Sequence, residues 1–418
     1  MEKSQLILDC LRERKDAVLF AIGEALTQLY PGKSILFGPE NGFDVEEYAH
    51  AGLCRLTQQA GVFTQTETSY YGRDYRLSET VASGWQDVEW NGRRFELLWV
   101  SQSGEFAQKR SYWLIADERE IAEAFLTTVV DWNSQLREEV FCYDGGCWGK
   151  SRELYSSIKA ASFERLILPP ALKTEMRADF RQFFDSRHVY ERYKLPWKRG
   201  VLLIGPPGNG KTHTIKALIN WLEVDCLYVK SLKSRHETEE HAIRDVFGLA
   251  RKTTPCLLVL EDLDSLITDE NRSFFLNEMD GFMDNDGILV VATTNHPERL
   301  DPAIMERPSR FDRKYYFELP APPEREAYFT MWNMAVEPDL RLSTDALMDL
   351  VANTDGFSFA YLKELWLSSM MRWINTGPGV GSQAGVMDRV MANQIGVLRK
   401  QMTSAAPQPV RYEDDTAG

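Results

Sequence analysis

The sequence has 418 residues and a formal net charge of −14, with 48 Lys or Arg against 62 Asp or Glu. At roughly 150 residues per domain, this length predicts two or three domains. A hydrophobic fraction of 44% and a charged fraction of 26% are typical of globular proteins, so a chain that is disordered throughout is excluded.

The first part of the chain is predicted to be helical. Apolar residues recur at helical spacing over residues 1–30, and a second helical stretch is expected over 45–59. We therefore expect residues 1–84 to form an N-terminal helical region.

Strand patterns follow from residue 85. The runs 85–90 and 93–100 flank Asn91-Gly92, which predicts a β-hairpin because both turn positions require a positive φ. A helix is expected over 117–136, with Asp117 as its N-cap. Six of the eleven tryptophans lie between residues 85 and 148, and such large aromatic side chains indicate a folded core. We expect a Trp-rich α+β domain over 85–160.

The pattern changes again at residue 161. A long helix is expected to end near Tyr193, and strands and helices then alternate. The strands are expected over 201–205, 226–230, 256–261 and 288–292, and the helices between them over 211–222, 239–251 and 271–279. This alternation predicts an α/β fold over 161–320, in which helices cover both faces of a parallel sheet. Residues 321–403 are expected to form a helical domain, and residues 404–418 a disordered tail.

The loop between the strand 201–205 and the helix 211–222 fits the pattern of a phosphate-binding loop. Its residues are Gly205, Pro206, Pro207, Gly208, Asn209, Gly210, Lys211 and Thr212. Glycines let backbone N–H groups surround phosphates, and a helix N-terminus favours negative charge. In this pattern Lys211 contacts the β- and γ-phosphates and Thr212 ligates Mg²⁺, so ATP and Mg²⁺ are the expected cofactors.

Three carboxylates follow the apolar run 257–260, namely Glu261, Asp262 and Asp264. A strand end beside a phosphate loop is where a nucleotide site needs one carboxylate for the metal and another for the attacking water. We expect Glu261 to share the metal with Thr212, and Asp262 to position the water.

Asn295 follows the strand 288–292, and Arg307 and Arg310 stand further along the chain. Together with the phosphate loop and the carboxylates, these residues resemble those of an AAA ATPase of the classical clade. The resemblance implies that Asn295 senses the γ-phosphate and that Arg307 and Arg310 are arginine fingers for a neighbouring subunit's nucleotide. It also implies a P-loop NTPase sheet, a C-terminal helical lid in which residues 355–358 resemble the start of the lid helix near the adenine, and a homo-oligomeric ring, expected to be a hexamer.

A narrower resemblance concerns residues 163–200 and the Glu-Asp order at 261–262. Both are similar to the mitochondrial ATPase group that translocates the Rieske iron–sulfur protein. No stretch approaches the ~18 apolar residues that a membrane span needs, so the soluble bacterial relatives of the YjoB type are the nearer match. Six scattered cysteines and the absence of a signal-peptide pattern predict a cytoplasmic location.

Three features depart from the family pattern. Most AAA proteins place Asp before Glu at the strand end, whereas here Glu261 precedes Asp262, which could slow hydrolysis. The segment before Arg307 carries one extra residue. Threading motors place an aromatic-hydrophobic-Gly trio at the central pore, and the corresponding stretch here is Arg235-His236-Glu237.

Two other patterns contain residue types that bind metals. His236 and His241 are five residues apart on a helix and diverge by about 140°, so they share no face. Cys142 and Cys147 lack a second pair of cysteines, which favours buried apolar cysteines over a zinc site.

These features together predict a cytoplasmic, ring-forming ATPase that remodels or chaperones protein clients, without threading them. A nucleic-acid-directed AAA machine, such as a loader or helicase, is the first alternative, although an acidic chain is poorly suited to neutralising phosphates. A nucleotide-gated scaffold with little turnover is the second. The sequence leaves the client and the number of subunits open.

Overall fold

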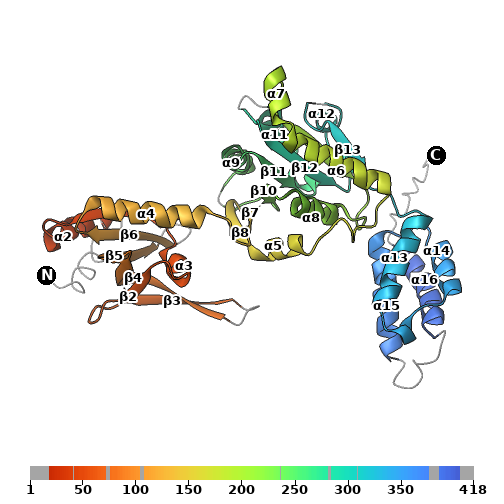
Figure 1. The fold of residues 1–418 in the computed structure, drawn as a ribbon, viewed down its shortest axis with the longest axis horizontal. Coiled ribbons are helices and arrows are strands. Elements are labelled where there is room, and N and C mark those ends of the chain that lie inside the picture. Colours follow the sequence, from red (N-terminus) through yellow and green to blue (C-terminus); the bar gives the residue numbers. More distant parts are fainter. Residues whose placement is uncertain are drawn as a thin grey trace, which may run out of the picture. The chain divides into compact units, whose positions relative to one another are not determined.

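The computed structural model describes residues 18–40, 42–71, 76–103, 108–235, 237–280, 284–307, 309–375 and 386–404, and the structural statements below concern these residues. The chain divides into two compact units, and the boundary in the sequence lies between Arg137 and Glu138. Each unit is described by itself (Figure 1).

The first unit is built on an antiparallel sheet. In chain order its elements are α2 (Val18–Leu29), β1 (Ser34–Pro39), α3 (Val45–His50), β2 (Arg55–Gln58), β3 (Gln65–Tyr71), β4 (Arg76–Trp90), β5 (Arg93–Ser103), β6 (Gln108–Ala116) and α4 (Arg119–Ser134). The strand order is β1-β6-β5-β4-β2, and β3 also pairs with β4. The hairpin predicted at Asn91-Gly92 is confirmed as the β4–β5 connection, with φ values of 48° and 73°.

Tryptophans form the core of this unit on both faces of the sheet. Trp99 packs with Phe43, Phe125 and Val129, from the loop before α3 and from α4. On the other face Trp85 and Trp113 pack against α2. All three tryptophans are almost fully buried, as expected from their number in this region.

Several predictions for the first unit are wrong. The helix expected over 45–59 ends at His50, because Gly52 has a positive φ of 76° and the following residues pair with β4 as strand β2. Residues 34–84 therefore contain strands β1, β2 and β3 and the first part of β4 instead of a helical region. The boundary expected after residue 84 lies inside β4. The expected cap is also wrong, since Glu118 is the N-cap of α4 and makes no side-chain capping bond.

The second unit contains the α/β fold predicted from the alternating pattern. Its strands are β7 (Val140–Asp144), β8 (Cys147–Ser151), β9 (Arg199–Ile204), β10 (Asp225–Val229), β11 (Cys256–Leu260), β12 (Ile288–Thr294) and β13 (Arg313–Tyr316). They follow the order β13-β9-β12-β11-β10-β7-β8, and all pairs are parallel except β7–β8.

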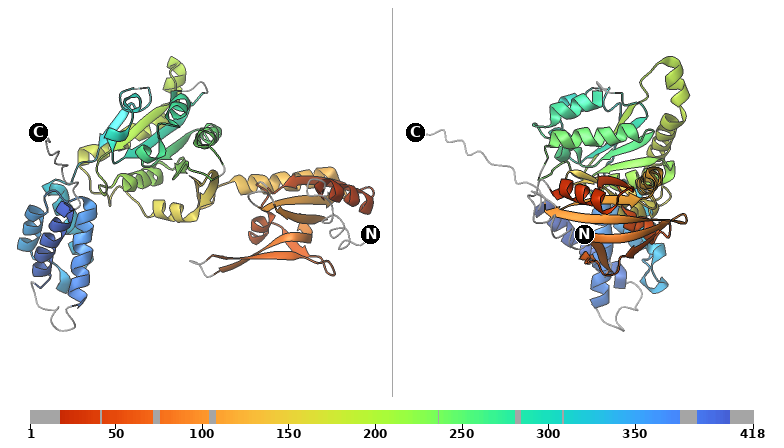
Figure 2. Two further views of the ribbon diagram at one scale, coloured as in Figure 1. Left: turned by 180° about the vertical axis from the view of Figure 1, so that it is seen from behind. Right: turned by 90° about the vertical axis from the view of Figure 1, so that its left-hand side faces the viewer.

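Helices cover both faces of this sheet (Figures 1 and 2). One face packs against α5 (Arg152–Lys159), α6 (Pro170–Asp185) and α8 (Lys211–Leu222). The other packs against α9 (Glu239–Lys252), α10 (Leu263–Leu266), α11 (Arg272–Asp280) and α12 (Pro302–Met305). The long helix expected to end near Tyr193 is instead two helices, since α6 ends at Asp185 and α7 (Arg187–Tyr193) begins after Ser186.

The hairpin β7–β8 adds two strands to one edge of the parallel sheet. The domain boundary expected after residue 160 therefore lies inside the second unit. β7 runs parallel to β10, and the backbone N–H of Lys230 donates to the carbonyl of Tyr143 at 3.0 Å. Residues 138–159 therefore belong to the second unit. Of the two cysteines in the hairpin, Cys142 is buried as expected, which raises the pKa of its thiol, whereas Cys147 is exposed.

The C-terminal part is helical, as predicted. It consists of α13 (Pro322–Ala335), α14 (Thr344–Asn353), α15 (Phe359–Asn375) and α16 (Val386–Ser404), which share a core around Phe329, Phe357 and Trp366. The tail expected over 404–418 lies outside the described residues, apart from Ser404 at the end of α16. No described helix is both long and apolar enough to cross a membrane.

Candidate active site

The predicted phosphate loop connects β9 to α8, at the carboxyl end of the parallel sheet. Gly208 and Gly210 have positive φ values of 78° and 88°, a conformation that side chains disfavour. Asn209 is buried, and its amide donates to the carbonyls of Phe317 at 3.4 Å and Glu318 at 3.0 Å. These contacts fix the loop from the segment that follows β13.

Close contacts explain why the loop needs glycine at two positions. A Cβ on Gly205 would lie 2.2 Å from the carbonyl oxygen of Phe317, and one on Gly208 would lie 2.5 Å from Cβ of Ala360. The N–H of Ala360 donates to the carbonyl of Gly208 at 3.1 Å. The start of α15, just after the predicted residues 355–358, therefore contacts the phosphate loop directly.

Lys211 is the first residue of α8 and its ammonium group lies inside the loop. The Nζ atom donates to the carbonyls of Gly205 at 2.6 Å and Pro206 at 3.0 Å, and to Oδ1 of Asn295 at 2.7 Å. Burial lowers the pKa of Lys211, and the negative charges of Asp262 and other carboxylates oppose this shift. A buried cation held between carbonyls and an amide oxygen is well placed to exchange these partners for phosphate oxygens.

Asn295 joins Lys211 to the carboxylates at the end of β11. Its Nδ2 donates to Oδ1 of Asp262 at 2.8 Å while its Oδ1 accepts from Lys211. Asp262 has a left-handed backbone with φ of 50°, and its N–H donates to Oγ1 of Thr293 at 2.9 Å. Three residues that are far apart in the sequence thus meet at the ends of β9, β11 and β12.

Glu261 lies next to this chain of contacts and has one oxygen without a protein partner. Oε2 accepts a hydrogen bond from the hydroxyl of Tyr228, whereas Oε1 is buried and has no hydrogen-bond partner among the described residues. A buried carboxylate oxygen left unpaired is costly, and a hard cation such as Mg²⁺ takes oxygen ligands. Glu261 and the exposed Thr212, at the start of α8, therefore fit the predicted metal site.

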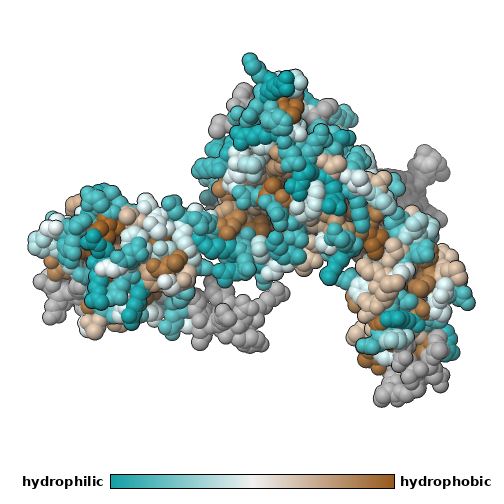
Figure 3. All heavy atoms as spheres, viewed as in Figure 1, coloured by the Kyte–Doolittle hydropathy of each residue, from teal (hydrophilic) through white to brown (hydrophobic). Residues whose placement is uncertain are grey.

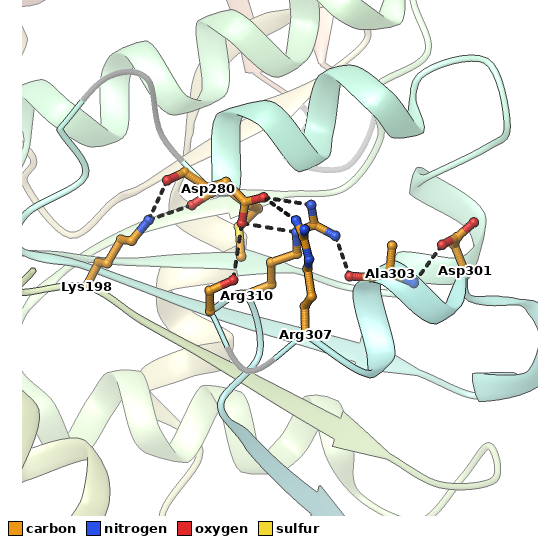
Figure 4. Close-up of polar contacts among 8 residues, drawn as sticks. Lys198, Asp280, Asp301, Ala303, Arg307 and Arg310 are labelled. Carbon is orange, nitrogen blue, oxygen red and sulfur yellow. Dashed lines mark hydrogen bonds and ion pairs between the residues drawn. The ribbon is translucent and has the colours of Figure 1, made fainter.

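Arg307 and Arg310 lie in a different environment, around Asp280 at the end of α11 (Figure 4). Arg310 is buried, and its guanidinium donates to Asp280 at 3.1 and 2.7 Å and also to the carbonyl of Ala303. The side chain of Arg307 is 64% exposed and has a single longer contact of 3.4 Å with Asp280. The hydrogen bond from Arg310 holds the pKa of Asp280 below its usual value.

The side chains gathered around His241 are not the histidine pair considered in the sequence. His236 lies outside the described residues, but Glu237, His241 and Asp245 have ligand atoms within 4.8 Å of one another. Two of the three side chains are exposed, and exposed carboxylates often approach one another in this way without an ion. We assign no metal to this cluster.

Tyr228 and Asp280 are parts of these arrangements that sequence reasoning misses. Tyr228 lies on a mostly apolar strand, where the sequence predicts a tyrosine to be part of the hydrophobic core. Asp280 is the last residue of a helix, where the sequence predicts an acidic side chain to face solvent. The pairing register of β10 and β11 is the signal that could have revealed the role of Tyr228. In that register Tyr228 pairs with Val259, two residues before Glu261.

The region that contains the phosphate loop is similar in sequence to known ATPases. Residues 201–319 match the family described as ATPase family associated with various cellular activities (AAA). The ATP-dependent zinc metalloprotease FtsH of Acidothermus cellulolyticus is 34% identical over 206 residues, which are 45% of this chain and 30% of that protein. The ribosome biogenesis ATPase RIX7 of Saccharomyces cerevisiae is 31% identical over 187 residues, 42% of this chain and 22% of that protein.

The chain thus spans less than a third of either relative. Among solved structures, the FIGL-1 AAA domain in complex with ADP aligns with a TM-score of 0.46 and 23% identity, over 58% of this chain and 88% of that one.

Proposed function

We propose that this chain, in which residues 201–319 form an AAA ATPase domain, is a Mg²⁺-dependent ATPase that acts on protein clients. The observation that carries the proposal is the contact chain from Lys211 through Asn295 to Asp262. It joins the residue suited to bind phosphate, the residue suited to sense it and the carboxylate suited to position water. Such positioning and charge stabilisation account for most of the catalysis of phosphoryl transfer.

The chain's own residues divide the reaction as follows. Backbone N–H groups of the phosphate loop and Lys211 bind the β- and γ-phosphates, displacing the lysine's carbonyl partners. Asp262 accepts a proton from the attacking water, and Asn295 holds that carboxylate in place. Glu261 and Thr212 would hold Mg²⁺, which neutralises charge on the phosphates.

Exchanging each carboxylate for its amide separates these two roles. Asp262→Asn should leave ATP bound while turnover falls by about 10²-fold or more, the scale of general-base catalysis. Glu261→Gln should instead raise the Mg²⁺ concentration needed for half-maximal turnover. ATP titration and steady-state hydrolysis at varied Mg²⁺ measure both effects, and exchanged phenotypes would exchange the two roles.

A homo-oligomeric ring, expected to be a hexamer, is part of the proposal. The exposed side chain of Arg307 suits an arginine finger that reaches a neighbouring subunit, whereas Arg310 is bound within its own chain by Asp280. The C-terminal helices also expose apolar side chains, including Met334, Met348 and Met371. Figure 3 shows apolar residues gathered on the visible face of these helices, as expected for a surface that contacts another protein.

The finer assignment is to soluble relatives of the Rieske-protein translocase group, of the YjoB type, in the cytoplasm. It is supported by the Glu261-Asp262 order and by the folded β-rich unit that precedes the AAA domain. The first unit, whose core holds Trp85, Trp99 and Trp113, is the part of the chain that we expect to bind clients.

A client is expected to be released without being pulled through the ring. Threading needs apolar aromatic side chains that grip an extended chain, but Arg235 and Glu237 are exposed charged residues. With ATP, the protein should suppress aggregation of a partly folded client and leave a stably folded fluorescent protein with an unstructured tail intact. Loss of fluorescence that depends on ATP and is abolished by Arg235→Ala/His236→Ala would show a working threading loop.

Two alternatives make different predictions in the same assays. A loader or helicase should hydrolyse ATP faster when DNA or RNA is added, which the net charge of −14 makes unfavourable. A nucleotide-gated scaffold should bind ATP and show almost no steady-state turnover.

Cross-linking clients to the Asp262→Asn variant, which should hold ATP without hydrolysing it, would identify the partner.

A further inference from the structure

Tyr228 lies on β10, and Glu261 directly follows the neighbouring parallel strand β11. The register places Tyr228 opposite Val259, and Glu261 comes two residues after Val259, just past the last residue of β11. The tyrosine and the glutamate therefore lie at the same end of the sheet. The Tyr228 hydroxyl donates a hydrogen bond to Oε2 of Glu261.

The tyrosine is buried beside Glu261. It is 4% exposed, and burial raises the pKa of its hydroxyl far above the usual value, with a further contribution from the negative charge of Glu261 and from the hydrogen bond itself. Its ring packs in the core on the face of the sheet that α5, α6 and α8 cover, so packing holds the hydroxyl in place.

The two oxygens of Glu261 are in unlike situations. Oε2 is bound by Tyr228, whereas Oε1 is buried without a partner among the described residues. A glutamate has one more rotatable bond than an aspartate, so it can present its carboxylate in more directions. The bond to Tyr228 removes this freedom at one oxygen and leaves the other available for a cation.

We propose that Tyr228 is a positioning residue that holds Glu261 so that Oε1 faces the Mg²⁺ of the nucleotide complex. The proposal rests on the proposed ATPase function and adds a physical reason for the reversed Glu-Asp order: a longer carboxylate serves as metal ligand because a tyrosine on the adjacent strand fixes it. Tyr228 itself contacts neither nucleotide nor metal in this arrangement.

The test compares Tyr228→Phe with wild type in metal binding. Mn²⁺ serves as a paramagnetic probe and is titrated into the complex with ADP, with free Mn²⁺ measured by electron paramagnetic resonance. The Kd of Mn²⁺ should rise by about 10-fold or more, the effect of losing a hydrogen bond to a charged group. Binding of ADP without metal should change less than twofold, because the hydroxyl of Tyr228 is bonded to Glu261 and not to the phosphate loop in the part of the chain that the structure describes.

Tyr315→Phe is the matched control. Tyr315 is another buried tyrosine of the same sheet, and its hydroxyl donates to Asp179 at 2.5 Å, away from Glu261. Both variants lose a buried tyrosine–carboxylate bond and should lower the melting temperature similarly. Only Tyr228→Phe should weaken Mn²⁺ binding, so equal Mn²⁺ affinity in the two variants would overturn the proposal.

A double-mutant cycle adds an independent test. Glu261→Asp shortens the carboxylate by one methylene and removes its contact with Tyr228, so adding Tyr228→Phe should change the Kd of Mn²⁺ by less than twofold. Fully additive effects would contradict the proposal. If the wild-type protein bound no nucleotide, or no Mn²⁺ together with ADP, the proposed ATPase function would be rejected. If the wild-type protein bound both and Tyr228→Phe had the same Kd for Mn²⁺, only the positioning role would be rejected.

Discussion

Replacing Lys211 with alanine is expected to abolish tight ATP binding, raising the Kd by about 10²-fold or more. Lys211 places a buried ammonium group within the phosphate loop, where it has three polar partners. Charge-assisted hydrogen bonds from such a group to phosphate are among the strongest in proteins, and the shorter side chain of alanine offers none. Titration with a fluorescent ATP analogue measures the loss.

Lys216→Ala is the matched control for this variant. Lys216 lies on the same helix, α8, but its ammonium group donates to Oγ of Ser157 at 2.8 Å and is not part of the loop. Its removal should leave the Kd of ATP unchanged. Near-native ATP affinity in a folded Lys211→Ala variant, checked by circular dichroism, would reject the loop as the nucleotide site.

The second unit was largely predictable because its elements are encoded by local patterns. Buried parallel strands such as β11 and β12 are continuous apolar runs, and glycine-rich segments mark the turns between strand and helix. Since the carboxyl ends of parallel strands share one edge, residues at those ends had to meet. Asn295 accordingly contacts both Lys211 and Asp262 at this edge.

The remaining features depend on contacts that no local pattern shows. The segment 45–59 has apolar residues at helical spacing, yet Gly52 and pairing with β4 convert its second half into a strand. The hairpin β7–β8 joins the parallel sheet only because β10 leaves an edge to which β7 can pair. Asp280 likewise gains its partner Arg310 from 30 residues away.

The two arginines are expected to give opposite phenotypes when each is replaced by alanine. Arg307→Ala should leave the melting temperature unchanged and lower ATP turnover by about 10³-fold, the effect of an arginine finger supplied by a neighbour. Arg310→Ala should destabilise the domain by about 1–2 kcal/mol, because it removes the main partner of the Asp280 carboxylate, which is partly exposed and can be hydrated. Thermal unfolding and steady-state hydrolysis of each variant distinguish the two roles.

Asp280→Asn tests the same division from the acidic side. If Arg310 acts by fixing its own loop, this variant should resemble Arg310→Ala in stability. The hydrogen bond from Arg310 lowers the pKa of Asp280, so the ion pair contributes fully at neutral pH and is lost only as the pH falls through that lowered value. The stability difference between wild type and Asp280→Asn should therefore be larger at pH 7 than in strong acid.

Mixing experiments test whether Arg307 acts on a neighbouring subunit. Arg307→Ala keeps an intact nucleotide site, and Lys211→Ala keeps an intact arginine, so an interface that combines them has one working site and one working finger. A mixture should recover part of the turnover that both variants lack alone, and this recovery should rise with protein concentration as rings assemble. Turnover of wild type that is independent of protein concentration, together with a monomeric mass in ATP, would contradict the ring. If Arg310→Ala were stable and also recovered activity on mixing, the contact with Asp280 would be released in the assembled ring and both arginines would serve as fingers.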